Sequence, residues 1–221
     1  MPIPIPDVRV RYRTFEFGEV DIHVRTLRDR QQFADPDGEA ARLGISSSAW
    51  PHFGVVWDAS QVLAGLMAEH EVEGKRILEV GCGIALASLV LNKRSANITA
   101  TDHHPEVEEF LRINAELNHG PRIPFVRTGW EDEPHEDLGV FDLVIGSDLL
   151  YEDHHARELS GFIDRHAAGS CEVILVDPGR GHHAKLSKRM VRLGYSHSQS
   201  RSPSPEDLSK PFTGQVLSYR R

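Results

Sequence analysis

The sequence has few cysteines and no long apolar run. Two of its 221 residues are cysteine, Cys82 and Cys171, and they form no C-x-x-C pair. Neither a disulfide framework nor a cysteine-ligated zinc site is therefore indicated. No stretch reaches the roughly 18 apolar residues of a membrane span, and the N-terminal MPIPIPDVRVRYR lacks the apolar core of a signal peptide. These absences predict a cytoplasmic protein without a membrane segment.

The chain also has no excess of positive charge. It carries 33 acidic and 25 basic residues, for a formal net charge of −8. Extended binding to nucleic acid favours a basic face, so this balance argues against a DNA or RNA partner. An acidic surface is compatible with a basic protein substrate, and equally with solubility alone. The length suits one α/β domain with a small N-terminal addition.

The stretch from Arg76 to Leu91, RILEVGCGIALASLVL, organises the rest. It predicts a buried strand, a tight glycine turn and the start of a helix. Leucine at position 86 takes the place of the third glycine of the dinucleotide fingerprint, and the P-loop pattern is absent. Gly81 and Gly83 let the backbone approach a ligand, and the helix start favours an anionic group. A strand-to-helix turn without any ligand is the alternative.

A second acidic position follows 23 residues after Glu79. The run from Asn97 to Asp102 predicts a strand that ends in a carboxylate. In nucleotide-binding α/β folds, an acid at this position accepts hydrogen bonds from the ribose hydroxyls. The alternative is that Asp102 caps the helix expected to begin near Pro105.

Strand-like apolar runs alternate with helical patterns along the chain. The expected strands cover residues 76–80, 97–102, 124–128, 141–146, 172–176, 195–201 and 215–220, and the expected helices cover residues 61–70, 105–118, 155–167 and 183–193. A β-hairpin of residues 8–17 and 20–27 precedes them. This alternation indicates a parallel sheet with helices on both faces. Ligands bind at the carboxyl ends of such strands, where Gly81, Asp102, Trp130 and Ser147 are expected to converge.

Other segments carry local predictions. Residues 28–44 read as a loop with one helical turn, and residues 45–53 as a turn-rich segment with an exposed Trp50-Pro51 pair. Residues 196–209, rich in serine and proline, are expected to form a surface loop between the last two strands. The helix at residues 61–70 is expected to pack on the sheet edge near the ligand.

Six motifs together carry a family resemblance. They are VVWDAS at 55–60, LEVGCG at 78–83, TATD at 99–102, FLRINAELN at 110–118, GW at 129–130 and FDLVIGSDLLYE at 141–152. With them the chain resembles the methyltransferase-like protein-lysine methyltransferase group (family 16), within the class I S-adenosylmethionine-dependent methyltransferases. The resemblance covers roughly residues 55–177. It implies a Rossmann-like, seven-stranded, mostly parallel sheet with an antiparallel last strand. It also implies S-adenosyl-L-methionine as cofactor, released as S-adenosyl-L-homocysteine.

The resemblance implies roles for particular side chains. The implied cofactor-binding residues are Trp57, Glu79, Gly81, Cys82, Gly83, Asp102, Trp130 and Ser147. The glycine loop would line the methionine half, Asp102 would hold the ribose, and Trp130 would pack on the adenine. Trp57 would close the methionine side, where an aromatic face suits a sulfonium. Asp148 and Tyr151 match a D-x-x-Y signature beside the transferred methyl, with Asp148 orienting the nucleophile and Tyr151 shaping the slot.

Each of these residues could instead have a purely structural role. A single tryptophan such as Trp57 or Trp130 usually packs in a core, and Tyr151 could be a buried phenol with a satisfied hydroxyl. Ala85 stands where the family has glycine, and we expect it to tolerate the same turn. Arg180, after Asp-Pro-Gly, either reaches the mouth of the site or lies in a solvated loop.

Three histidine pairs, at 103–104, 154–155 and 182–183, draw attention to a metal site. Adjacent side chains rarely point the same way, and no cysteine or carboxylate spacing supports a set of ligands. No metal is therefore expected.

The implied activity is methyl transfer to a protein side-chain nitrogen, with lysine first and histidine second. Residues 1–54 would form a hairpin and cap segment over the substrate mouth, and residues 55–221 the methyltransferase domain. One alternative is a small-molecule N-methyltransferase with a small amine as partner and the N-terminal segment as a lid. The other is a module that binds the cofactor without catalysis. The [DN]-P-P-[FY] motif is absent, which argues against DNA bases and glutamine, and the oligomeric state stays open.

Overall fold

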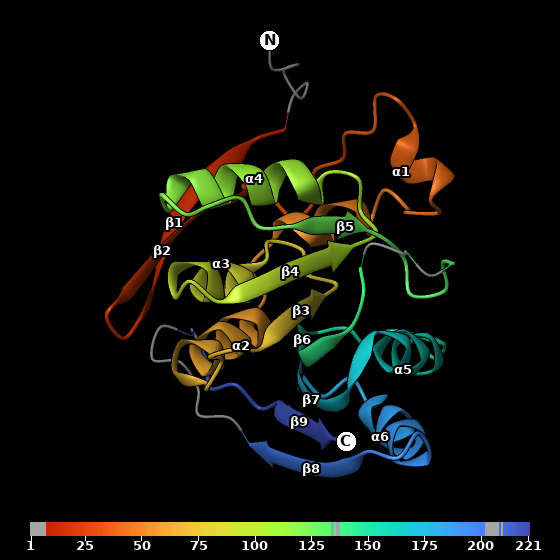
Figure 1. Ribbon diagram of the computed structural model, residues 1–221. Coiled ribbons are helices and arrows are strands. Elements are labelled where there is room, and N and C mark those ends of the chain that lie inside the picture. The colour runs from red at the N-terminus through yellow and green to blue at the C-terminus, as the bar shows by residue number, and fades with distance from the viewer. Residues whose placement is uncertain (1–7, 134, 136–137, 202–207, 209) are drawn as a thin grey trace.

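A seven-stranded sheet forms the centre of the computed structural model, which describes residues 8–133, 135, 138–201, 208 and 210–221 (Figure 1). In spatial order the strands are β5 (Phe125–Arg127), β4 (Asn97–Asp102), β3 (Arg76–Val80), β6 (Phe141–Ser147), β7 (Ala167–Asp177), β9 (Gln215–Arg220) and β8 (Ser196–Arg201). The pairs from β5 to β7 are parallel, whereas β9 runs antiparallel to both of its neighbours. This confirms the predicted mostly parallel sheet with an antiparallel last strand.

Helices cover both faces of the sheet (Figure 1). One face carries α2 (Asp58–Glu69), α3 (Leu86–Lys93) and α4 (Val107–Leu117), and the other carries α5 (His155–His166) and α6 (His183–Arg192). Two short elements, α1 (Glu39–Arg42) and the 3-10 helix η1 (Trp50–Gly54), lie before α2. No helix in the described part of the chain is long and apolar enough to cross a membrane.

Alternation along the central strands explains why both faces are covered. Ile77, Leu143 and Ile145 are fully buried in the apolar cluster that includes α2 and α3. Their chain neighbours Leu78 and Val144 are buried in the opposite cluster, beneath α5 and α6. A strand with apolar side chains on both sides requires cover on both sides, which the crossover helices supply.

The N-terminal hairpin of β1 (Val10–Phe17) and β2 (Val20–Leu27) packs beside α4. Two asparagine side chains, Asn114 in α4 and Asn118 directly after it, join the hairpin to the main domain. The N–H groups of His23 and Arg25 donate to the Oδ1 atoms of Asn118 and Asn114, at 2.8 and 2.7 Å. The same amides donate back to the two carbonyls of β2, at 2.7 and 3.3 Å. Asparagine amides thus pair with the outer edge of β2 as a third strand would.

Two local predictions were wrong, and a third segment carries two overlapping predictions. Trp50 was expected to be exposed but is buried, with only 1% of its surface accessible. The rings of Phe33, Phe53 and His104 surround it, with ring centroids 5.3 to 6.0 Å away. Helix α2 lies against β6, β7 and α3, so it covers the middle of the sheet and not an edge. Residues 196–201 form β8, which confirms the strand expected at 195–201 and shows that the expected loop does not begin at residue 196; residues 202–207 and 209 lie outside the described residues.

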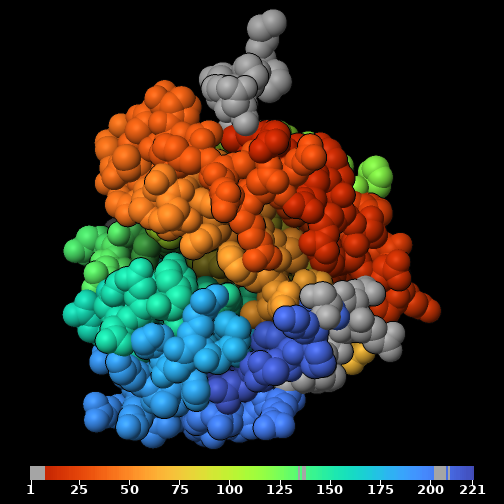
Figure 2. All heavy atoms as spheres, turned by 180° about the vertical axis from the view of Figure 1, so that it is seen from behind, coloured from red at the N-terminus to blue at the C-terminus, as the bar shows by residue number. Residues whose placement is uncertain are grey.

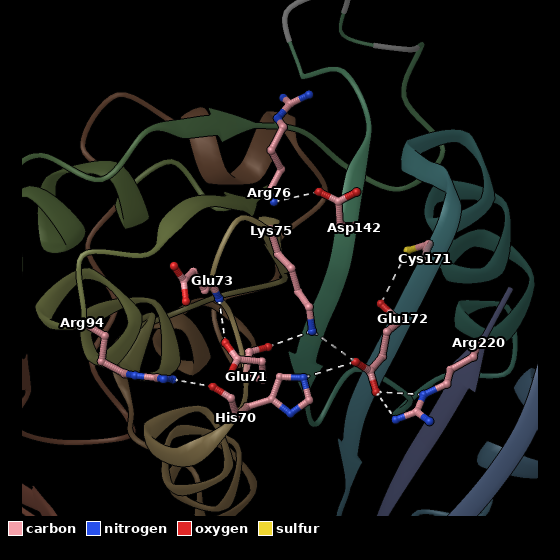
Figure 3. Close-up of polar contacts among 10 residues, drawn as sticks. All are labelled: His70, Glu71, Glu73, Lys75, Arg76, Arg94, Asp142, Cys171, Glu172 and Arg220. Atoms are coloured by element: carbon pink, nitrogen blue, oxygen red, sulfur yellow. Dashed lines mark hydrogen bonds and ion pairs between the residues drawn. The ribbon is translucent and has the colours of Figure 1, made fainter.

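A group of charged side chains gathers at the amino end of the sheet (Figure 3). Glu172 of β7 meets His70 Nε2 at 3.2 Å, Lys75 Nζ at 3.8 Å and Arg220 at 2.8 Å. The Glu172 side chain is 15% exposed. It therefore joins the segment just after α2 to β7 and β9 by charge, far along the strands from the carboxyl ends.

Candidate functional site

A cavity of about 670 Å³ opens at the carboxyl ends of β3, β4 and β6. Ligand pockets in proteins usually measure roughly 300–1,000 Å³, so a cofactor-sized molecule fits. Its walls come from the glycine loop, the end of β4, the residues after β5 and β6, and the segment around η1. The space-filling view from behind shows the hollow between the orange residues before α2 and the teal residues after β6 (Figure 2). It lies where the sheet topology predicts a ligand.

Asp102 holds the glycine loop in shape. Its Oδ2 accepts a hydrogen bond from the Gly83 N–H at 2.9 Å, and its Oδ1 accepts one from the His104 N–H at 2.9 Å. Burial raises the pKa of Asp102, but the bonds and charge from His103 and these N–H groups outweigh it, so the pKa lies below its ordinary value. Helix α4 begins at Val107 after the N-cap residue Glu106 and has no side-chain cap, so the helix-cap interpretation of Asp102 was wrong.

The turn itself depends on left-handed backbone conformations. Gly81 and Gly83 have φ of 58° and 52°, and a Cβ on Gly83 would lie 3.1 Å from the Phe53 carbonyl oxygen. Ala85 also adopts φ 59°, immediately before α3. This conformation costs a non-glycine residue roughly 1–2 kcal/mol. The alanine therefore holds this turn with some local strain. Cys82 lies between the glycines and lines the cavity.

Glu79 differs from the other residues predicted to bind the cofactor, because it does not line the cavity. Its Oε2 accepts hydrogen bonds from the backbone N–H, at 2.9 Å, and from the hydroxyl of Ser88 in α3. Burial raises the pKa of Glu79 to about 7, against the opposing effect of Ser88. In the structure Glu79 fastens β3 to α3, and the geometry gives no support to a direct contact with the cofactor.

Both predicted tryptophans line the cavity. Trp130 follows β5, and its ring edge is 3.5 Å from the Cβ position of Gly81. Trp57 immediately precedes α2, and its Nε1 donates to the His52 carbonyl at 3.1 Å. Neither ring is fully buried, so each presents a surface to the hollow.

The predicted catalytic residues follow β6 at the mouth. Asp148 has φ 53°, and its N–H donates to the Val176 carbonyl at 2.9 Å. Ser147 and Tyr151 also line the cavity. The Tyr151 side chain is exposed, at 49%, with its ring 4.3 Å from that of His155. The alternative of a buried core phenol was therefore wrong.

Arg180 reaches the mouth of the site. Its Nε and Nη2 donate to the two carboxylate oxygens of Asp148 at 2.7 and 2.8 Å. The sequence left this position open between the mouth and a solvated loop. The Asp-Pro-Gly turn before it was the only signal, and it does not define the direction of a side chain.

The segment before α2 contributes wall residues that the motifs did not identify. Ile45, His52 and Phe53 line the cavity. The Phe53 ring stacks on His104 at 4.1 Å, which places η1 against the residues that follow Asp102. Their signal was weak, because an isolated histidine and phenylalanine in a turn-rich segment have no motif spacing.

Among the described residues, one group could hold a metal ion: Glu152, His154 and His155, with ligand atoms within 4.8 Å of one another. Glu152 and His154 are exposed, and His155 Nδ1 accepts a hydrogen bond from the Glu152 N–H at 3.3 Å. The prediction that no metal is bound stays a prediction.

The fold and the position of the cavity define a Rossmann-like methyltransferase architecture. The T. thermophilus 16S rRNA N2 G1207 methyltransferase, solved with AdoMet and guanosine, matches with a TM-score of 0.66 and 14% identity. That match covers 99% of this chain and 52% of that one. The ribosomal protein L11 methylase of Lactobacillus delbrueckii subsp. bulgaricus matches with a TM-score of 0.57 and 21% identity, over 74% and 78% of the two chains. At these identities the likeness concerns the fold.

The chain belongs to the lysine methyltransferase family, whose profile matches residues 46–187. Protein N-lysine methyltransferase METTL21A of Danio rerio is 31% identical over 145 residues, and EEF1A lysine methyltransferase 3 of Mus musculus is 26% identical over 155 residues. Histone-arginine methyltransferase METTL23 of Xenopus laevis is 30% identical over 103 residues, 44% of each chain. The matches to the first two cover 61% and 64% of this chain and 61% and 66% of those relatives, somewhat less than two thirds of their length.

Proposed function

We propose that this chain is an S-adenosylmethionine-dependent methyltransferase that methylates a side-chain nitrogen of a protein, with lysine as first choice and histidine as second. The observation that carries the proposal is the cavity in which the glycine loop, Asp102, Trp130 and Asp148 meet. When bound, the cofactor supplies an electrophilic methyl group on a sulfonium. The chain's own residues hold that group, align the nucleophile and exclude water, and positioning of this kind supplies much of the rate.

The cofactor end of the cavity suits a nucleoside with a charged tail. Asp102 keeps a lowered pKa and is therefore ionised near neutral pH. An ionised carboxylate at this position accepts hydrogen bonds from a vicinal diol. Trp130 offers a flat face for the base, and Trp57 an aromatic face for the sulfonium. Gly81 and Gly83 leave room for the backbone of the loop to touch the ligand.

The acceptor end carries a carboxylate and a phenol. Asp148, when free of Arg180, would attract a cationic side chain, and Tyr151 beside it is exposed to a partner as large as a protein. An amine attacks only as the neutral base, so it must lose a proton before transfer. Three relatives are named as lysine methyltransferases, which supports the same choice: METTL21A, EEF1A lysine methyltransferase 3 and the electron transfer flavoprotein beta subunit lysine methyltransferase.

Calorimetry with S-adenosyl-L-homocysteine tests the cofactor site. We expect the wild type to bind and Asp102→Ala to bind at least about 100-fold more weakly, since charged hydrogen bonds contribute about 1.5–3 kcal/mol each. Asp21→Ala, at an exposed carboxylate of the hairpin, is the matched control and should bind as the wild type does. Absence of heat from the wild type, or equal affinity in Asp102→Ala, would remove the site.

Labelled S-adenosyl-L-methionine separates the acceptor classes. The enzyme is incubated with a cell extract divided into protein and metabolite fractions, and label is located by intact-mass analysis. We expect label on protein, at lysine. Label in the metabolite fraction alone would favour the small-molecule alternative, and cofactor binding without any label would favour a non-catalytic module.

A further inference from the structure

Asp148, the carboxylate expected to orient the methyl-accepting side chain, is already paired with an arginine of this chain. Both of its oxygens bind the guanidinium of Arg180, at 2.7 and 2.8 Å. Only 11% of the Asp148 side chain is exposed, whereas 46% of Arg180 is. A bidentate arginine pair is among the stronger hydrogen-bonded arrangements. The acceptor end of the cavity is thus closed to a second cation while Arg180 stays in place.

The two partners are held very differently. Asp148 directly follows β6, and its backbone N–H is bonded to the neighbouring strand. Arg180 lies between Gly179 and Gly181, whose φ values are 95° and 93°. No atom lies within 4 Å of a Cβ placed on either glycine, so the backbone there has little packing to hold it. The segment is anchored by Asp177, whose carboxylate accepts the Gly179 N–H at 3.1 Å.

We propose that Arg180 is a resident competitor of the methyl acceptor, which a cationic side chain must displace from Asp148 before it reaches the slot. The proposal rests on the proposed function, because it takes Asp148 as the acceptor-binding carboxylate. Paired with Arg180, the carboxylate has no net attraction for a further cation. A neutral amine or alcohol cannot replace the guanidinium ionically, so Arg180 selects cationic acceptors. The glycines on both sides allow it to leave without disturbing β7.

The fraction of molecules in which Arg180 occupies Asp148 determines how tightly a cationic acceptor binds. If the pair is closed for most of the time, the apparent affinity for a cationic acceptor is reduced by the fraction of molecules in which Asp148 is free. Removal of Arg180 should therefore tighten binding of the cation and lower KM. A purely supporting role for Arg180 predicts the opposite, since loss of the partner would leave Asp148 misplaced.

The test uses n-butylammonium as a probe with the shape and charge of a lysine side chain. The ¹⁵N-labelled protein, saturated with S-adenosyl-L-homocysteine, is titrated with n-butylammonium chloride, and potassium chloride at equal ionic strength serves as the blank. The Arg180 side-chain Nε–H resonance, assigned by its loss in Arg180→Lys, reports whether Arg180 is paired with Asp148. The backbone amides near Tyr151 report binding in every variant.

We expect n-butylammonium, and not neutral n-butanol, to shift the Arg180 resonance towards that of a free arginine. Arg180→Ala should bind the probe roughly tenfold more tightly, as expected when an alternative occupant present about nine times in ten is removed. Asp148→Asn should abolish binding. Lys185→Ala removes another exposed cation, paired with Asp153 at 2.6 Å, and should leave the affinity unchanged.

Equal or weaker probe binding by Arg180→Ala would overturn the proposal, as would an Arg180 resonance that does not move while the probe binds. Failure of the proposed function gives a different result. If S-adenosyl-L-homocysteine does not bind, the same titration on the cofactor-free protein still measures competition between Arg180 and the probe for Asp148. All variants are compared by thermal unfolding, so that a misfolded one is recognised.

Discussion

At the scale of single residues, two buried acids show how surroundings decide their roles. Asp102 and Glu79 are 8% and 2% exposed, and both lie on neighbouring strands. Backbone N–H groups and His103 surround Asp102 and hold its pKa low. Glu79 has Ser88 as its bonded partner, and burial raises its pKa to about 7. The first can serve a ligand as an ionised acceptor, and the second stabilises the protein best when protonated.

Glu79 predicts a pH dependence of stability. Its pKa is about 7 in the folded chain against 4.5 for an ordinary glutamate, so the folded state binds the proton more tightly. The stabilisation is full below pH 4.5 and is lost as the pH rises towards 7, by about 3 kcal/mol at most. We expect Glu79→Gln to remove this slope in urea unfolding measured from pH 4.5 to 8. Glu69→Gln, at an exposed position, is the control and should keep it; a variant as steep as the wild type would refute the assignment.

At the scale of helices and strands, the sequence predicted the sheet and its helices to within five residues, the largest difference being β7, which begins at Ala167 and not at residue 172. It failed where tertiary packing decides. Trp50 stands among serine, proline and histidine, a polar surrounding that suggests exposure, but rings from distant segments, Phe33 and His104, pack against it. Likewise Glu172 reads as an ordinary charge within a strand. Its partners His70 and Arg220 are 102 and 48 positions away.

Glu172 offers a test of how the elements are joined. Glu172→Gln keeps the size of the side chain but leaves His70, Lys75 and Arg220 without their shared anion. We expect a loss of roughly 1–2 kcal/mol in the free energy of unfolding at pH 7. Burial raises the pKa of Glu172, but Arg220 and the other cations lower it overall. The loss should therefore shrink as the pH falls and the wild-type carboxylate is protonated.

A matched substitution separates this cluster from an ordinary surface pair. Glu116→Gln breaks an exposed contact with Arg112 on α4 and should cost under about 0.5 kcal/mol. Equal losses from the two variants in urea titrations would mean that Glu172 does not join the elements.

At the scale of the whole molecule, the cavity is lined by residues from both sides of the predicted domain boundary at residue 54. The family profile begins at residue 46. Phe15 and Val24 of the hairpin share one apolar cluster with Ile77 of the central sheet. The motifs predicted the glycine loop, Asp102, Trp57, Trp130 and the residues after β6, because loop, strand end and motif spacing are local properties. They could not predict the wall from η1 or the Arg180 contact, which arise from long-range packing.

Ligand linkage should be visible in the stability of the entire chain. At S-adenosyl-L-homocysteine concentrations 100-fold above Kd, binding to the folded state alone adds about 2.7 kcal/mol. For a chain of this length that corresponds to a rise in Tm of roughly 5–10 °C. Differential scanning calorimetry measures it, with Asp102→Ala as the comparison. A similar rise in that variant would place the ligand somewhere other than beside Asp102.

The amides of Asn114 and Asn118 on the backbone of β2 have one more consequence. A two-stranded ribbon normally leaves two rows of hydrogen-bonding groups that can recruit strands from other molecules. Here side chains of a helix close one row, and the exposed Arg11 and Arg13 line the strand that bears the other. The hairpin is thereby protected against edge-to-edge aggregation: asparagine side-chain amides take the place of a neighbouring strand on one side, and positive charge repels one on the other.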